Sequence, residues 1–283
     1  MELYNENSLY KLKELPNNSV DCCITDPPYF IDKMASEWDL AKLKASAQKA
    51  GVVGGMPVGM KFDPRQGKDL EKFMHEISTE LYRILKPGAF FLSFSAPRLY
   101  HRMACGIENA GFEIRDEYIW KRPGQAKAFS QTHFVQKMKI SDEEKAKIIA
   151  SLDNRKTPQL KPEFEAIVMA QKPREDTFVK NWMKYGVGLV DVSQSLDGMF
   201  PGTIMDVPKD QNNIPHFTVK PIKLIEHLIK LFTQEGATII DPFMGSGTTG
   251  IACINTNRDF IGIELSEEYF QLSEKRLAAA MQE

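Results

Sequence analysis

The chain has 283 residues, of which 42% are hydrophobic and 26% are charged, and its formal net charge is −2. Both fractions are ordinary for a soluble globular protein, and no apolar run is long enough to span a membrane. The first residues lack the basic and apolar pattern of a secretory signal, so we expect a cytoplasmic protein with no membrane partner. The net charge neither indicates nor excludes a nucleic-acid partner, because a local basic face is enough to contact phosphates.

The length is sufficient for one large α/β domain, or for a core domain that carries a smaller insertion. The four cysteines have neither the spacing of a disulfide framework nor that of a metal site. We therefore expect no bound metal, and we expect all four to pack in the core: Cys22, Cys23, Cys105 and Cys253.

The first predicted elements are a strand, a loop and a helix. The short apolar run "VDCCIT", residues 20–25, predicts a central strand that ends at Asp26. Residues 31–66 have weak periodicity and a cluster of glycines, which indicates a mobile loop. An apolar stripe from Leu70 to Leu85 then predicts a helix.

That helix is predicted to end at "KPG", residues 86–88, and the buried strand "AFFLSFS" follows it. The next helix is expected from about Arg98 to Ala110, with Gly111 ending it. After it, "FEIRDEYIW" at 112–120 alternates like a strand.

Residues 121–215 are irregular, with basic clusters interleaved with aromatic residues, although "FEAIVMAQKP" within them predicts another strand. Between residues 121 and 180 Lys and Arg outnumber Asp and Glu. Charge alone leaves two interpretations open, a solvated insertion and a subdomain that faces nucleic acid.

The last part of the chain is regular again. Pro221 suits the first turn of a helix that carries Leu224 and Leu228 on one side and ends at Gly236. From Ala237 onward the pattern is strand, glycine turn, helix, strand and helix, which is a βαβ unit.

The glycine turn has the spacing GxGxxG, in Gly245, Gly247 and Gly250, and Glu264 follows at the end of the next strand. This pattern suits any cofactor that contains adenosine, so a nicotinamide oxidoreductase must be considered. Too little chain follows to complete the sheet, so its other strands must come from the N-terminal half. Asp241 lies just before the glycines, where it would repel a pyrophosphate but could neutralise the ammonium group of S-adenosylmethionine.

"DPPY" at residues 26–29 stiffens the chain directly after the first strand. The prolines hold Asp26 and Pro27 extended and remove backbone donors, which leaves the Asp26 carboxylate and the Pro27 carbonyl as acceptors. Together they could bind both hydrogens of one amino group, while Tyr29 and Phe30 offer faces for stacking a planar ring. The segment alone could also be a rigid strand-to-loop turn. Beside the glycine turn, we interpret it as a clamp for the exocyclic amine of a base.

Together these segments resemble the amino-group DNA methyltransferases of the bacterial restriction–modification and phage type, in the beta subgroup. The matching stretches are "NSVDCCITDPPY" at 18–29, "HFTVKP" at 216–221, "DPFMGSGTTGIAC" at 241–253 and "FIGIELSEEYF" at 260–270. The resemblance implies a class I, Rossmann-like α/β fold that binds S-adenosylmethionine without a metal. It implies a catalytic domain of residues 1–120 and 216–283, and a target-recognition region with some core elements at 121–215.

The resemblance also implies roles for individual residues. The catalytic segment would be Asp26, Pro27, Pro28 and Tyr29. Thr218 and Lys220 would lie against the methionine end of the cofactor, and Asn7 would contact its adenine ring. The other cofactor-binding residues would be Asp241, Phe243, Gly245, Gly247, Thr248 and Glu264.

The predicted function is methylation of the adenine amino group in double-stranded DNA, after the base is flipped out of the helix. An initial aspartate resembles the adenine-modifying members more than those that modify the cytosine N4 amine, which is the nearest alternative. The others are a nicotinamide oxidoreductase, a binding module without turnover, and an amine presented by RNA or protein. Family members are often dimers, so a homodimer is also considered.

Overall fold

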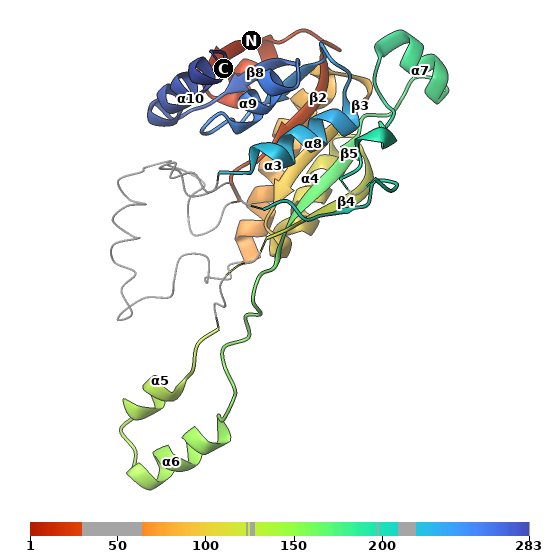
Figure 1. Cartoon of the computed structure of the whole chain (residues 1–283). Helices are drawn as coiled ribbons and strands as arrows, with labels where there is room; N and C mark the ends of the chain where they lie inside the picture. The colour runs from red at the N-terminus through yellow and green to blue at the C-terminus, as the bar shows by residue number, and fades with distance from the viewer. Residues whose placement is uncertain (30–63, 123, 125–127, 197, 209–218, 283) are drawn as a thin grey trace. The chain divides into compact units, whose positions relative to one another are not determined.

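The chain folds around one mixed β-sheet. The computed structural model describes residues 1–29, 64–122, 124, 128–196, 198–208 and 219–282. The sheet has eight strands in the order β1-β8-β7-β2-β3-β5-β4-β6. Their bounds are β1 Glu2–Tyr4, β2 Val20–Thr25, β3 Leu85–Ser95, β4 Glu113–Lys121, β5 Phe164–Gln171, β6 Ile204–Met205, β7 Thr238–Asp241 and β8 Asp259–Ile263. Figure 1 labels β8, β2, β3, β5 and β4.

The directions of the strands decide which residues share an edge of the sheet. Neighbouring strands from β1 through β8, β7 and β2 to β3 are all parallel, as the predicted joining of "VDCCIT" to the βαβ unit requires. β5 runs antiparallel to β3, with Ser95 opposite Ala166. The beginning of β5 therefore lies at the same edge as the carboxyl ends of the parallel strands.

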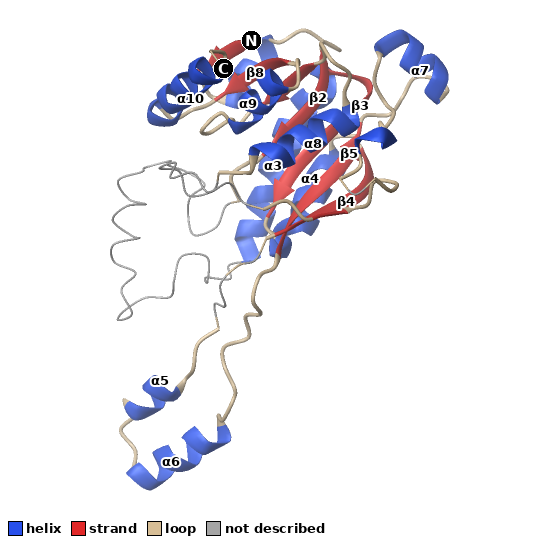
Figure 2. Ribbon diagram, viewed as in Figure 1, coloured by secondary structure: helices blue, strands red, loops and turns tan. Residues whose placement is uncertain are grey.

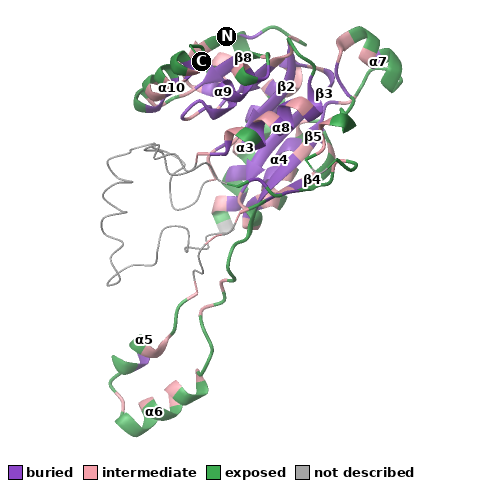
Figure 3. Cartoon of the chain, in the orientation of Figure 1, coloured by how far each residue is buried: buried purple, intermediate pink, exposed green. Residues whose placement is uncertain are grey.

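Helices cover both faces of this sheet, which confirms the predicted α/β class (Figure 2). The principal helices are α1 Ser8–Glu14, α3 Pro64–Ile84, α4 Tyr100–Asn109, α7 Phe178–Tyr185, α8 Ile222–Phe232, α9 Thr248–Asn255 and α10 Glu267–Ala280. Helices α1, α3 and α4 pack with Cys23 and Phe91 in one core cluster, whereas α8 and α9 pack with Cys22 and Phe90 in the other. Successive residues of β2 thus enter opposite clusters, and all six residues of the strand are buried (Figure 3).

The first long helix does not end at residues 86–88, where the sequence predicted its end. α3 ends at Ile84 and β3 begins at the next residue, so these residues belong to the strand. The pairing with β2 is irregular there, and Gly88 has a φ of +86°. Its N–H donates to the Lys172 carbonyl, and the Asn181 amide donates to the Pro87 carbonyl. A bulge of this kind tolerates the proline that would end a helix.

The other predicted elements have close counterparts. The strands at 112–120 and 164–173 correspond to β4 and β5, and the helix at 98–110 corresponds to a 3₁₀ turn followed by α4. Pro221 is the residue before α8 instead of lying in its first turn, and the helix ends before Gly236. The expected loop at 31–66 lies outside the described residues up to residue 63, and residues 64–66 belong to α3.

Contacts divide the chain into two compact units. The first is residues 1–120 and 165–283, and the second is residues 121–164. β5 pairs with β3, so it is part of the first unit's sheet. The second unit contains α5 Thr132–Gln136 and α6 Asp142–Ser151, and α6 begins with a capping box between Ser141 and Glu144. The target-recognition role predicted for residues 121–215 stays a prediction.

Two expectations from composition can be compared with the side chains. Cys22, Cys23 and Cys253 are buried, but Cys105 is exposed, so its predicted core position is wrong. On α4 the buried face carries Met103, Gly106 and Ile107, and Cys105 lies on the other face. Among the described residues, no helix has the length and apolar character that crossing a membrane requires, and no group of three or more acidic, histidine or cysteine side chains could hold a metal ion.

Candidate active site

Three predicted acidic residues lie at one edge of the sheet. Asp26 directly follows β2, Asp241 is the last residue of β7, and Glu264 directly follows β8. The three strands are parallel neighbours, so their carboxyl ends form the crevice in which open α/β sheets bind ligands. The sequence patterns therefore predicted correctly which residues share this edge.

The Asp26 carboxylate is the centre of a hydrogen-bonded cluster. The Tyr29 hydroxyl donates to Oδ1 of Asp26, and the Lys220 ammonium contacts Oδ2. Lys220 is only 6% exposed, and its Nζ also lies over the Phe94 ring at 4.8 Å from the centroid. The Lys220 ammonium, which is distant in the sequence, thus meets the hydroxyl and the carboxylate of the DPPY segment at the end of β2.

Glu165 is the fourth member of the cluster, and sequence reasoning missed it. Its Oε1 lies 2.9 Å from the Tyr29 hydroxyl oxygen and 3.3 Å from Lys220 Nζ, and the residue is 6% exposed. Glu165 is the second residue of β5, whose reversed direction brings it to the catalytic edge. An acidic residue at the start of a buried strand was the only available signal, and the direction of that strand could not be read from the sequence.

The surroundings of the cluster raise the pKa of Asp26, Tyr29 and Lys220. Burial raises the pKa of Asp26, and repulsion from Glu165 adds to this, while Lys220 acts in the opposite direction. Burial and the two neighbouring carboxylates raise the pKa of Tyr29. For Lys220, burial lowers the pKa, but the ion pairs with Asp26 and Glu165 outweigh this effect and raise it overall. The lysine is therefore a fixed positive charge between two carboxylates.

The DPPY segment is anchored by packing on both sides of the sheet. Pro27 is buried, and the half-buried Tyr29 ring contacts both core clusters. This fixes the backbone next to Asp26, as the two prolines predict. Phe30, the second predicted stacking ring, lies outside the described residues.

The glycine turn and Glu264 form the second part of the crevice. Oε2 of Glu264 accepts from the Gly245 N–H at 2.9 Å, and Oε1 accepts from the Ser266 N–H at 2.8 Å. Gly245 and Gly247 have φ values of +51° and +79°, which only glycine adopts readily. Burial raises the pKa of Glu264, against the lowering effect of these backbone donors.

Gly250 serves packing inside the fold. A Cβ there would lie 2.7 Å from Leu277 and 2.8 Å from the Phe260 ring, so glycine lets α9 approach both α10 and β8. Gly247 is similarly close to Ser273 of α10. Of the three motif glycines, Gly245 is the one whose backbone adjoins the Glu264 carboxylate.

Asp241 is buried and has internal partners on both carboxylate oxygens. Oδ1 accepts from Thr25 Oγ1 at 2.6 Å and from the Phe243 N–H at 3.0 Å, and Oδ2 accepts from Thr249 Oγ1 at 2.7 Å. Burial raises its pKa to about 6, although these donors act in the opposite direction. Asp241 therefore ties β2 to the glycine turn, and its predicted pairing with a cofactor ammonium stays a prediction.

The other predicted cofactor residues lie around the same turn, except for one. Phe243 is half-buried and its ring is 5.7 Å from that of Phe73, while Thr248 is buried at the start of α9. Asn7 caps α1 by accepting from the Leu9 N–H at 2.9 Å. Its segment adjoins Glu264, whose carbonyl accepts from the Asn5 amide at 2.8 Å. Thr218 lies outside the described residues.

These groups fit a ligand that contains adenosine. A carboxylate held by two backbone N–H groups can accept from ribose hydroxyls, and the half-buried Phe243 ring can lie against a planar base. Lys220 was predicted to pair with the cofactor carboxylate. Its ammonium instead contacts Asp26 and Glu165 here, so its role toward the cofactor stays a prediction.

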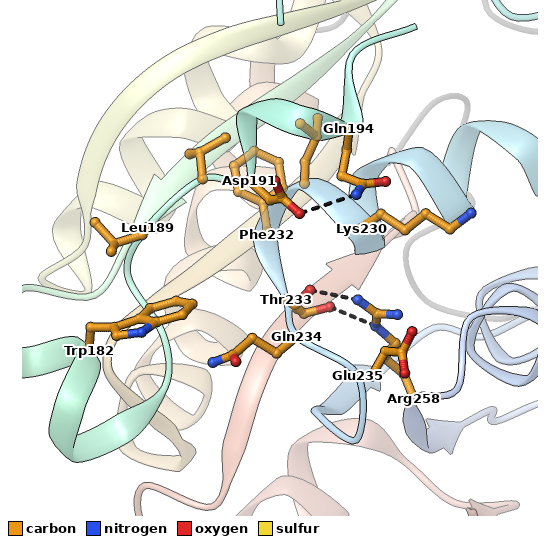
Figure 4. A pocket seen from close by; sticks show the side chains of 12 residues that line it. Trp182, Leu189, Asp191, Gln194, Lys230, Phe232, Thr233, Gln234, Glu235 and Arg258 are labelled. Atoms are coloured by element: carbon orange, nitrogen blue, oxygen red, sulfur yellow. Dashed lines mark hydrogen bonds between the residues drawn. The ribbon is translucent and has the colours of Figure 1, made fainter.

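A separate cavity of about 620 Å³ lies near the amino ends of β7 and β8, away from this crevice (Figure 4). Trp182, Leu189 and the end of α8 contribute to its lining. Its Arg258 donates to the Thr233 carbonyl at 2.7 Å, and Asp191 accepts from Gln194. Both side chains therefore have partners within the protein.

Solved structures with the same architecture are methyltransferases. The chain matches the M1.HpyAVI complex with S-adenosylmethionine at a TM-score of 0.56 and 21% identity, over 98% of this chain and 99% of that one. It matches the cytosine-N4-specific PvuII DNA methyltransferase at a TM-score of 0.63 and 16% identity, over 99% and 90% of the two chains. These likenesses confirm the predicted class I methyltransferase fold.

Sequence comparison gives the family. The chain is 27% identical to the Type II methyltransferase M.HindIII of Haemophilus influenzae, over 97% of this chain and 94% of the relative. It is also 27% identical to the Type II methyltransferase M2.DpnII of Streptococcus pneumoniae, over 99% and 90% of the two chains. The family model described as DNA methylase, of the N6/N4 type, matches residues 20–275. The chain belongs to this family, so the predicted DNA amino-methyltransferase is confirmed.

Proposed function

We propose that this DNA amino-methyltransferase transfers a methyl group to the exocyclic N6 amine of adenine in double-stranded DNA. The observation that carries the proposal is the Asp26 carboxylate, fixed at the end of β2 beside Tyr29, in a family of N6 and N4 DNA methylases. The methyl donor is S-adenosylmethionine, which, when bound, supplies an electrophilic methyl group on a sulfonium. Residues from β7 to β8 would hold it: Phe243, Gly245 and Glu264.

The chemistry that this chain supplies is the preparation of a weak nucleophile. The lone pair of an adenine amine is conjugated into the ring, so the nitrogen attacks poorly. The Asp26 carboxylate and the Pro27 carbonyl would accept hydrogen bonds from its two N–H groups and hold the nitrogen in the attacking geometry. As the nitrogen gains a bond to carbon it becomes positive, and the Asp26 carboxylate can accept the proton that it must lose. A target base would first have to leave the duplex stack, at a cost of a few kcal/mol.

Adenine is preferred to cytosine because the catalytic segment begins with aspartate, in keeping with the resemblance described above. The cytosine N4 amine remains the alternative, since it presents the same two N–H bonds. A nicotinamide oxidoreductase leaves Asp26, Tyr29 and Lys220 without a role and does not fit the family. The homodimer and the cytoplasmic location stay predictions.

The deciding experiment is transfer of labelled methyl from S-adenosylmethionine to unmethylated bacterial genomic DNA, with digestion to nucleosides and identification by mass. We expect N6-methyladenine from the wild type. We expect a rate lower by at least about 100-fold from Asp26→Ala, because the main acceptor of the amine is lost. Substitution of the exposed Glu113 by Gln is a control for handling and for loss of a carboxylate.

N4-methylcytosine as the product would keep the mechanism and overturn the proposed base. Transfer to RNA or protein and none to DNA would overturn the proposed substrate. Equal rates for the wild type and Asp26→Ala would overturn the role of Asp26.

A further inference from the structure

Two buried carboxylates share one ammonium and one hydroxyl at the catalytic edge. Lys220 contacts both Asp26 and Glu165, and the Tyr29 oxygen lies within hydrogen-bond distance of both. The amine clamp described above uses Asp26 and the Pro27 carbonyl but gives no task to Glu165. A carboxylate that is 6% exposed is costly to keep unless it interacts with charge or hydrogen-bond donors.

We propose that Glu165 is a positioning residue of methyl transfer, which takes the Lys220 ammonium and the Tyr29 hydroxyl from Asp26 when a substrate amine arrives. This inference rests on the proposed amino-methyltransferase function and adds a residue to its machinery. Glu165 itself does not touch the reacting atoms in this mechanism. It acts through the two groups that it shares with Asp26.

The hydroxyl proton gives the first argument. Tyr29 has one O–H, so it can donate to only one carboxylate at a time, yet oxygens of both Asp26 and Glu165 are within reach. When the hydroxyl turns to Glu165, Oδ1 of Asp26 is released to accept an N–H from the substrate. The distance of 2.9 Å from Tyr29 to Glu165 is already that of a formed hydrogen bond, so the exchange needs no backbone movement.

Charge gives the second argument. Asp26 paired with Lys220 alone would form a neutral unit, with little attraction for the positive charge that develops on the attacking nitrogen. With Glu165 also ionised, two carboxylates and one ammonium leave one net negative charge in a buried site, where charges interact more strongly than in water. The 3.3 Å separation of Lys220 Nζ from Glu165 Oε1 lets the ammonium stay paired while Asp26 faces the amine.

The sheet explains why Glu165 can do this. β5 runs opposite to the strands that carry the other acidic residues, so its second residue meets the ends of theirs. The charged or titratable groups that face Asp26 come from several segments: Tyr29 from the DPPY turn, Lys220 from before α8, Glu165 from β5 and Asp241 from β7. Of these groups, Glu165 is the second carboxylate that contacts Lys220. It can therefore hold the ammonium while Asp26 faces the amine, and it is not itself part of the clamp.

The test compares wild type, Glu165→Gln, Glu165→Asp and the exposed control Glu113→Gln at saturating S-adenosylmethionine. For Glu165→Gln we expect kcat to fall roughly 10- to 100-fold, the loss that is typical when a carboxylate that orients a metal ligand is removed from a metal site, with the KM for S-adenosylmethionine nearly unchanged. Glu165→Asp keeps the charge and should recover part of the rate. The control should behave as the wild type.

The pH profile separates positioning from a merely structural role. Activity requires ionised Asp26, so kcat rises with pH through the pKa of that carboxyl. Removing the charge of Glu165 lowers this pKa, so the acidic limb of the Glu165→Gln profile should move to lower pH by about one unit. A lower kcat with an unmoved limb, or a wild-type kcat, would overturn the proposal.

A compensating substitution tests the charge argument. Glu165→Gln combined with Lys220→Met leaves Asp26 as the only charged member of the set Asp26, Glu165 and Lys220, and so restores one net negative charge to that set. Because loss of the Lys220 ammonium raises the pKa of the Asp26 carboxyl, the variants are compared at a pH above that pKa. There we expect the double variant to be faster than Glu165→Gln at saturating cofactor. A double variant that recovers none of the lost rate, while its thermal unfolding matches that of the single variant, would contradict the charge argument.

One readout does not depend on turnover. Carboxyl ¹³C NMR of the free enzyme, with Asp26 assigned by its absence in Asp26→Ala, should show Asp26 titrating at lower pH in Glu165→Gln than in the wild type. An unchanged Asp26 titration overturns the proposal. If the wild type transfers no methyl group but this shift is present, the proposed function fails while the coupling of Glu165 to Asp26 stands.

Discussion

Asp26 and Asp241 are neighbours at one edge of the sheet, yet their carboxylates are stabilised in different ways. Asp26 interacts with an ammonium, whereas the donors to Asp241 among the described residues are neutral and come from Thr25, Thr249 and the Phe243 backbone. Three neutral donors do not offset the loss of water around a buried charge, so the Asp241 pKa rises to about 6.

Asp241 should make the protein less stable as pH rises through weakly acidic values. Its pKa is raised on folding, so the folded protein holds this proton more tightly than the unfolded chain. The free energy of unfolding should therefore fall between pH 4 and pH 6 and stay lower above that range. The shift from 3.8 to about 6 corresponds to about 3 kcal/mol in all.

Urea unfolding of the wild type and Asp241→Asn at pH 4.5 and pH 7.5 tests this. The stability of the wild type relative to the variant should be greater at pH 4.5 than at pH 7.5 by about 2 kcal/mol, because the variant has no proton to release. The exposed Asp259→Asn variant controls for the loss of one carboxyl. Parallel pH dependences of the wild type and Asp241→Asn would contradict the prediction.

At the scale of the elements, the close packing of α9 depends on a glycine. A methyl group at Gly250 would meet the Phe260 ring and Leu277, both of which are buried. Gly250→Ala should therefore destabilise the protein by roughly 1–3 kcal/mol through overpacking. Gly202→Ala is the matched control, since a Cβ there has no atom within 4 Å, and it should change stability by less than about 0.5 kcal/mol.

The midpoint of urea unfolding, measured for both alanine variants under the same conditions, decides this prediction. Equal midpoints for Gly250→Ala and Gly202→Ala would mean that α9 can move away from β8 and α10 without loss. The glycine would then serve ligand approach instead of packing.

Local patterns predicted most elements and the acidic residues at the carboxyl ends of β2, β7 and β8. Strand runs and the residues after them are adjacent in the sequence, so "VDCCIT" with Asp26 could be interpreted without the fold. Glu165 could not, because its position depends on the reversed direction of β5, which long-range pairing decides. The partners of Lys220 and Asp241 could not be predicted either, since each contacts residues about two hundred positions away.

At the scale of the whole molecule, residues 121–164 form a compact unit whose two ends are hydrogen-bonded to each other. The Arg122 N–H donates to the Glu163 carbonyl at 2.8 Å, and the Gly124 N–H donates to the Pro162 carbonyl at 2.9 Å. A two-residue turn can therefore join these ends. Replacing residues 125–160 by Asn-Gly should leave the sheet intact, because Asn-Gly favours a tight hairpin connection.

We expect this shortened chain to bind S-adenosylmethionine as the wild type does and to unfold cooperatively. Its affinity for duplex DNA should fall at least about tenfold and depend less on salt, because basic residues of the second unit are lost. Calorimetry with the cofactor and fluorescence anisotropy with a labelled duplex measure the two affinities. An unchanged DNA affinity would contradict the predicted target-recognition role of this unit.

The second unit ends at Phe164, and the next residue is Glu165. If the unit selects the target and Glu165 positions the catalytic cluster, one peptide bond, between Phe164 and Glu165, joins the part of the chain that selects the DNA sequence to the part that positions the catalytic residues. Substitutions far from this junction could change the recognised sequence and leave the reaction rate alone. Near Phe164 a new target and a new rate would have to be acquired together, so the evolution of new specificities in such a chain should avoid this junction.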